Sequence, residues 1–203
     1  MTHLRYANKS DALQRDTLID ITRASPKLMQ ALRTARNLNP PDWWIVSGAI
    51  YNQVWNHLTG RPDLFGVKDI DLFYFDRDTS YEAEDRIIQT ATSLFATDPP
   101  IEIRNQARVH LWYEQHFGEN YSALENCQQA IDRFASKTHS VGMRLRDDDS
   151  IDIYAPFGLN DIFSFLVTPN TTRNNRQTHE RKSARQIQLW PELKIVPWPD
   201  EPI

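Results

Sequence analysis

Segments in which apolar residues recur every three or four positions alternate along the chain with short, dense apolar runs. The first pattern predicts helices, and the second, where proline or glycine bounds it, predicts strands. Helices are predicted over residues 10–23, 25–37, 49–58, 80–95, 105–117, 122–135, a short stretch from 159, and 178–190. Strands are predicted over residues 43–46, 67–76, 101–103, 141–145 and 151–154.

Local signals set several of these helix boundaries. Ser10, Ser25 and Ser80 are predicted N-caps, because a serine hydroxyl accepts a hydrogen bond from an amide of the first helical turn. Ser122 and Glu125 have the spacing of a capping box, which predicts that a helix begins there. The polar segment 169–177 is predicted to be a mobile loop.

The order strand, helix, strand, helix, strand, followed by a hairpin, predicts a small mixed β-sheet covered by helices. This is the α+β class, with a core like that of α/β proteins. A chain of 203 residues is long enough for one sizeable domain with helical additions. We expect an N-terminal helical segment over residues 1–42, a core over 43–168, and a C-terminal helix with a Pro- and Trp-rich tail over 169–203 that packs on the core.

Composition narrows the class of protein. The chain is 40% hydrophobic and 25% charged, without an apolar run of the roughly 20 residues that span a bilayer. We therefore expect a cytoplasmic protein without a membrane partner. Its single cysteine, Cys127, excludes an internal disulfide and a cysteine-based zinc site. The net charge of −4 argues against a broad nucleic-acid-binding face but is compatible with a small basic pocket for nucleotide phosphates.

Two acidic residues, Asp69 and Asp71, interrupt the apolar run at 67–76. On a strand they point to the same face, where two carboxylates repel unless a cation joins them. Such a pair favours Mg²⁺ (or Mn²⁺), held by oxygen ligands for phosphate chemistry. The alternative interpretation is that Asp69 ends a loop and Asp71 pairs with a basic residue.

Two further features accompany the pair. The turn Ser47-Gly48-Ala49 lies between a strand and a helix, where backbone amides can hold a phosphate. Glu102 lies on the following strand and can join the two aspartates if the strands are neighbours. Three carboxylates beside a phosphate-binding turn are the groups needed for attack on the α-phosphate of a nucleoside triphosphate (NTP).

Basic residues flank these carboxylates. Lys68, Arg104 and Arg108 either bind phosphates or act as counter-ions for the acids. Arg104 is the preferred phosphate ligand, because it shares a strand face with Glu102. Asp152, on the predicted hairpin, is a fourth candidate carboxylate, for which a structural role is favoured.

The order of glycine turn, Asp-x-Asp strand and later acidic strand resembles the nucleotidyltransferase superfamily, which has the polymerase-β-like fold. More closely, the chain is similar to the bacterial nucleotidyltransferase-like family formerly called DUF925. The matching segments are Ser47–Gly60, Lys68–Asp71, Glu102–Tyr113, Ile153–Gly158 and Trp190–Leu193.

The resemblance implies a Mg²⁺-dependent enzyme that transfers a nucleoside monophosphate from an NTP to an acceptor hydroxyl, on a small molecule, a protein or RNA. In that family role Asp69, Asp71 and Glu102 bind the metal, and Glu102 could also be the general base. The residues implied to bind the NTP are Ser47, Gly48, Ala49, Lys68 and Arg104.

The chain departs from the superfamily pattern in two ways. Ala49 follows Gly48 where glycine or serine is usual, and twenty residues separate Gly48 from Asp69, a longer connection than is common. These departures favour the main alternative, a non-catalytic nucleotide- or protein-binding module that retains the scaffold. A third possibility is a toxin- or antitoxin-like role in modifying tRNA or protein.

Overall fold

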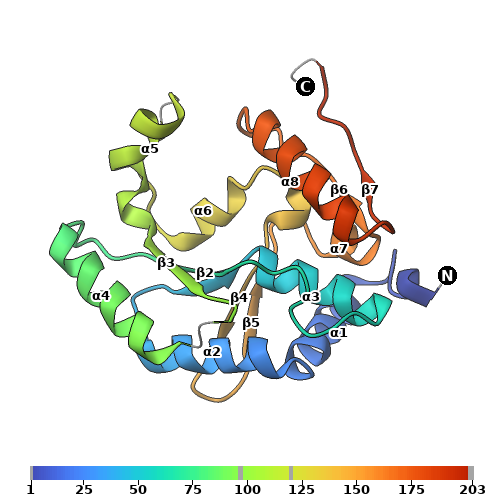
Figure 1. The fold of residues 1–203 in the computed structure, drawn as a ribbon, viewed down its shortest axis with the longest axis horizontal. Coiled ribbons are helices and arrows are strands. Elements are labelled where there is room, and N and C mark those ends of the chain that lie inside the picture. Colours follow the sequence, from blue (N-terminus) through green and yellow to red (C-terminus); the bar gives the residue numbers. More distant parts are fainter. Residues whose placement is uncertain (1, 96–97, 119–120, 201–203) are drawn as a thin grey trace.

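A computed structural model describes residues 2–95, 98–118 and 121–200. Its centre is a five-stranded mixed sheet in the order β3-β2-β1-β4-β5 (Figure 1). The strands are β1 (Trp44–Val46), β2 (Ile70–Tyr74), β3 (Ile101–Asn105), β4 (Gly142–Leu145) and β5 (Ile151–Tyr154). Only β2 and β3 are parallel; the other neighbours run antiparallel. A separate parallel pair joins β6 (Leu166–Val167) to β7 (Lys194–Ile195).

Helices cover both faces of the sheet. They are α1 (Asp11–Arg23), α2 (Pro26–Leu38), α3 (Gly48–Thr59), α4 (Tyr81–Leu94), α5 (Val109–Phe117), α6 (Cys127–Asp132), α7 (Asn160–Phe163) and α8 (Arg176–Leu189). In Figure 1, α2 and α4 lie on one side of the strands, and α5, α6 and α8 on the other. The predicted α+β class, a mixed sheet covered by helices, is confirmed. None of the described helices is long and apolar enough to cross a membrane.

The serine caps form as predicted. The hydroxyls of Ser10, Ser25 and Ser80 accept hydrogen bonds from the third residue beyond each, at the start of α1, α2 and α4. Each cap satisfies an amide that the first turn leaves without an intrahelical partner.

The helix predicted over 122–135 is much shorter and has a different cap. The Asn126 side chain accepts the hydrogen bond from the Gln129 amide, and the helix begins at Cys127 and ends at Asp132. The capping box of Ser122 and Glu125 is therefore wrong. The Glu125 amide, which the box would join to Ser122, donates instead to the Gln129 side chain, and the Arg133 guanidinium donates to the Ser122 carbonyl.

Two other boundaries differ from the prediction. The strand expected over 67–76 is only Ile70–Tyr74, which leaves Asp69 at the end of the preceding loop. The helix expected from residue 105 begins at Val109, after Asn105 has ended β3 and Gln106–Arg108 has formed one 3₁₀ turn. The segment 169–177 is anchored at buried Asn170, whose side chain donates to the carbonyls of Asp132 and Phe134.

One hydrophobic core contains side chains from the N-terminal, central and C-terminal parts of the chain. Trp190, at the end of α8, is 1% exposed and packs on the Trp55 ring. Its indole N–H donates to Oδ1 of Asn56 at 3.0 Å. The C-terminal helix is therefore fixed against α3, which begins at the predicted phosphate turn.

Substitution of Gly66, in the loop before Asp69, measures how closely Trp190 at the end of α8 packs on this loop. A Cβ at Gly66 would lie 2.6 Å from the Trp190 ring, whereas at Gly60 it would meet nothing within 4 Å; both residues have φ just above +70°. Gly60→Ala therefore measures the cost of the backbone conformation alone. Gly66→Ala should lower the free energy of unfolding by about 1–3 kcal/mol more, measured by urea denaturation. Equal losses would show that Trp190 does not confine this loop.

Candidate active site

Asp71 is held between two neighbouring strands. Its strand alternates in burial, with Ile70, Leu72 and Tyr74 facing the core, so Asp71 points to the opposite face. In the hydrogen-bonded register Asp71 lies opposite Val46 of β1 and Glu102 of β3. The strands are thus neighbours, as the prediction for Glu102 required, and three of them converge at Asp71.

The turn after Val46 begins α3 beside this carboxylate. Ser47 is 2% exposed, and its backbone has φ 59° and ψ −115°, a conformation that residues other than glycine rarely adopt. Strained backbone of this kind is concentrated at functional sites. Gly48 does not need a positive φ, and a Cβ there would meet the nearest side-chain atom at 3.7 Å. That is an ordinary van der Waals contact, so neither the backbone nor the packing requires glycine at the start of α3, where no side chain caps the amides.

A polar cavity of about 250 Å³ adjoins the turn. Its lining includes Ser47, Gly48, Asp69 and Asp71, with Lys68 at the same cavity. The predicted phosphate turn, the aspartate pair and one predicted cation are therefore brought together. Ala49 is fully buried in the core and is not among the residues that line this cavity.

Helix α8 supplies site residues that sequence reasoning missed. Lys182, Arg185 and Gln186 line the polar cavity, and the Arg185 guanidinium donates to the Gly66 carbonyl at 2.8 Å. Their spacing of three and four residues places them on one helical face. That spacing was visible in the sequence, but the helix was interpreted only as an addition that packs on the core.

A buried polar network fixes α8 against α3. The Gln186 amide donates to the Tyr51 hydroxyl at 3.0 Å and contacts the His139 ring on its other side. The Tyr51 and His139 rings stack with centroids 4.7 Å apart. Burial, reinforced by the nearby Lys182 charge, lowers the pKa of His139 to about 3, so this imidazole is neutral at physiological pH. It is a supporting group and not a proton donor.

The environment of Asp71 opposes its ionisation. Burial raises the pKa of Asp71 from its ordinary 3.8 to about 7. The Lys182 charge lowers this pKa, whereas the charges of Asp69 and Glu102 raise it. Carboxylates crowded in this way are stabilised by a bound cation, because an added positive charge favours their ionised form.

Glu102 faces a wider groove together with Arg104. Its carboxylate forms an ion pair with the Arg104 guanidinium at 3.1 Å, and both side chains are about half exposed. No three His, Cys, Asp or Glu side chains in the described part of the chain surround a common point as metal ligands would. Asp69 and Asp71 are therefore the pair that shares one cavity, with Glu102 adjacent to Asp71 on the next strand.

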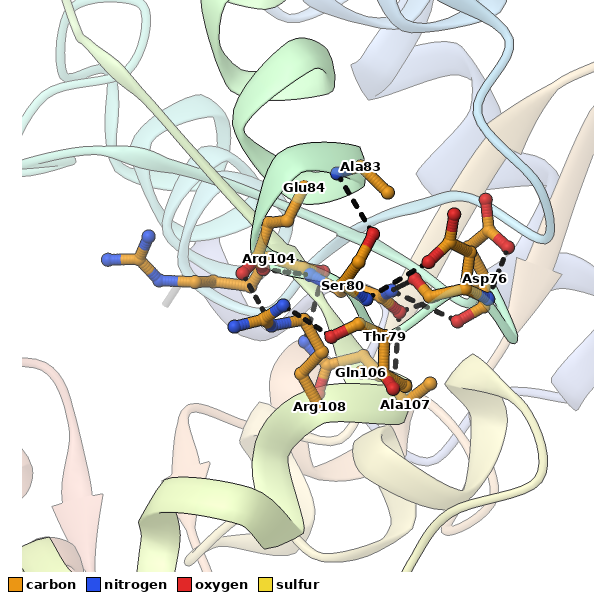
Figure 2. Close-up of polar contacts among 11 residues, drawn as sticks. Asp76, Thr79, Ser80, Ala83, Glu84, Arg104, Gln106, Ala107 and Arg108 are labelled. Carbon is orange, nitrogen blue, oxygen red and sulfur yellow. Dashed lines mark hydrogen bonds and ion pairs between the residues drawn. The ribbon is translucent and has the colours of Figure 1, made fainter.

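Two other candidates have structural partners. Arg108 pairs with Glu84 at 2.8 Å and donates to the Thr79 carbonyl, and Figure 2 shows the Arg104 side chain extending away from this cluster. Asp152 pairs with Arg144 and Arg146 on the β4–β5 hairpin. Arg108 therefore has the contacts of a counter-ion, one of its two interpretations, and Asp152 has ion pairs that suit the structural role favoured for it.

Comparison with known proteins identifies the family to which this fold belongs. The family model described as "Nucleotidyltransferase" matches residues 33–195, so the chain belongs to this family. A solved NMR structure described as revealing a CCA-adding enzyme head domain superposes with a TM-score of 0.72. It shares 24% identity, over 89% of this chain and 95% of the other, and shows likeness of fold. No curated protein sequence matches significantly.

The raised pKa of Asp71 predicts an unusual pH dependence of stability. Between about pH 4 and 7 the folded chain binds a proton at Asp71 that the unfolded chain has released, so stability falls as pH rises through this window. The loss is at most about 4 kcal/mol. Urea denaturation at pH 5 and pH 8, without divalent metal, measures it.

Asp71→Asn should remove this component of the pH dependence, because the amide does not titrate. Asp20→Asn, at an exposed position on α1, is the matched control and should retain the wild-type profile. An Asp71→Asn profile identical to that of the control would contradict the assignment.

Proposed function

We propose that this protein is a Mg²⁺-dependent nucleotidyltransferase that transfers a nucleoside monophosphate from an NTP to an acceptor hydroxyl. The observation that carries the proposal is the position of Asp71 and Lys182. Both line the polar cavity at the Ser47–Gly48 turn, and both also line the wider groove on the other side. A transferring phosphate at this junction would be reached from two directions, as in-line displacement requires.

The donor set suits a hard divalent cation. Asp69 and Asp71 offer carboxylate oxygens in one cavity, which Mg²⁺ or Mn²⁺ prefers, and Glu102 is the third candidate ligand. A bound Mg²⁺ would neutralise charge on the phosphate oxygens and polarise the phosphorus toward attack.

The protein's own cations would bind the rest of the triphosphate. Lys68, Lys182 and Arg185 line the cavity into which the amides at the start of α3 open. A helix N-terminus and cationic side chains together favour the β- and γ-phosphates and the departing pyrophosphate. Arg104 is on the groove side of Asp71 instead, so its proposed contact is with the α-phosphate or the acceptor.

Glu102 is the proposed general base. Its carboxylate lines the groove beside Asp71, on the side from which an acceptor would approach. From there it can accept the proton of the attacking hydroxyl, while the neutral, buried His139 forms part of the groove wall.

Two observations favour the second candidate function, a module that binds a nucleotide or protein without turnover. Glu102 is engaged by Arg104, and the backbone strain at the turn falls on Ser47 instead of a glycine. Such a module would keep the ability to bind an NTP or a protein partner, although Glu102 would not act as a metal ligand or general base.

Calorimetric titration with ATP, GTP, CTP and UTP tests the donor site. With Mg²⁺ present, wild type should bind at least one NTP, and Asp69→Asn/Asp71→Asn should lose the metal-dependent binding. Lys182→Gln should weaken binding about tenfold or more, because a charged contact to phosphate is removed. Lys9→Gln, exposed and outside both cavities, is the control for loss of one positive charge.

The outcomes test the donor site first. Metal-dependent binding that the aspartate variants lose supports this site and justifies a screen for acceptors, in which transfer of the nucleoside monophosphate distinguishes the enzyme from a module that binds nucleotide without turnover. No binding of any NTP by folded wild type would overturn the proposal and leave a module for a protein partner. Equal loss in Lys182→Gln and Lys9→Gln would overturn the role of α8.

A further inference from the structure

The wide groove beside Asp71 has a charge opposite to that of the whole chain. It measures about 660 Å³ and lies between strands β2 and β3 and the helices α5, α6 and α8, which are on one side of the sheet in Figure 1. Two carboxylates line it among the described residues, Asp71 and Glu102, against six cations. The cations are Arg104, Arg133, Arg173, Arg176, Arg181 and Lys182. In a chain with a net charge of −4, this concentration indicates an anionic ligand.

The start of α8 contributes to the same charge. Arg181 is exposed, and its guanidinium forms no ion pair within the described part of the chain. Asn175, at the helix N-cap, donates its side chain to the Arg133 carbonyl instead of accepting from a helix amide. The N-terminal amides of α8 therefore have no side-chain cap where the helix meets the groove. Their partial positive charge acts in the groove together with the charges of the arginines.

Aromatic rings alternate with these cations. Tyr113 and Tyr121 have ring centroids 4.4 Å apart, and the guanidinium groups of Arg133 and Arg173 lie over the Tyr121 ring at 4.7 and 4.8 Å. Trp112, in the same lining, is 36% exposed. Flat rings and guanidinium planes beside phosphate-binding charge are the surfaces on which nucleobases stack.

We infer that this groove binds the acceptor, and that the acceptor is a nucleotide, either free or at the end of a single-stranded nucleic acid. The inference rests on the proposed function and adds its substrate class. The volume suits one ligand of nucleotide size. The net charge predicted no broad nucleic-acid-binding face, and the groove is a local basic surface of a different kind.

Asp71 lines both the polar cavity and the groove, and this arrangement suggests how the reaction would proceed. The acceptor hydroxyl oxygen, approaching from the groove, forms a bond to the α-phosphorus. The bond from that phosphorus to the oxygen bridging to the β-phosphate breaks, and pyrophosphate leaves through the polar cavity. The hydroxyl proton passes to the Glu102 carboxylate. The product is the acceptor nucleotide extended by one nucleoside monophosphate.

Fluorescence anisotropy with a fluorescein-labelled single-stranded oligoribonucleotide, without NTP, tests the groove. Arg181→Glu should raise the Kd about tenfold or more and reduce the salt dependence by about one charge. Arg33→Glu, exposed on α2 across the sheet, is the matched control and should bind like wild type. Arg181→Gln should show a smaller loss in the same direction.

Competition by AMP distinguishes the two sources of the nucleotide. Displacement of the oligoribonucleotide by AMP supports a free nucleotide as acceptor, and binding that AMP does not displace supports a nucleic-acid end. The inference is overturned if wild type binds neither probe, if both glutamate variants lose binding equally, or if poly-glutamate competes as well as RNA. It is also overturned if Mg²⁺–NTP displaces the probe fully, because the groove would then belong to the donor.

The calorimetric NTP titration tests the donor site independently of the groove. Wild type that binds Mg²⁺–NTP but neither nucleotide probe contradicts this inference alone and leaves the proposed function in place. Wild type that binds neither NTP nor probe contradicts both.

Discussion

The site depends on a carboxylate that the backbone ladder forces into a poorly solvated position. Asp71 is fixed opposite Val46 and Glu102 by hydrogen bonds to both neighbouring strands, so it cannot withdraw from the acids beside it. Burial and these charges raise its pKa, and positive charge must be supplied for it to ionise. The protein supplies part of that charge with Lys182 of α8, which lines the same cavity as Asp71 and lowers its pKa.

The packing of α8 connects stability with the site. Trp190 and the Gln186–Tyr51–His139 contacts hold the helix against the first turns of α3. That contact fixes Lys182 and Arg185 beside the turn at Ser47 and Gly48. The same helix begins at the basic groove, so its two ends serve the two spaces that meet at Asp71. A change in α8 packing is therefore expected to alter both spaces together.

The sequence was sufficient for features that depend on neighbouring residues. The Asp-x-Asp pair, the serine caps and the order of helices and strands along the chain follow from local spacing, and Glu102 was expected beside the pair if its strand was a neighbour. Features that depend on tertiary packing or on competing polar side chains were not predictable. Lys182 reaches the aspartates only through tertiary packing. The Gln129 side chain accepts a hydrogen bond from the Glu125 amide that the capping box would use, and Asn126 caps the helix four residues later. The unusual φ at Ser47 was missed because the residue pattern indicated Gly48. The basic groove was hidden because net charge averages over the whole surface.

The most direct test is NMR titration of Asp71, with aspartate labelled at the carboxyl carbon and its signal assigned by Asp71→Asn. The account predicts a midpoint near pH 7 without metal, and a lower midpoint when Mg²⁺ and a non-hydrolysable ATP analogue are added, because a bound cation favours the ionised carboxylate. A midpoint near the ordinary 3.8 that Mg²⁺ and the analogue leave unchanged would contradict it.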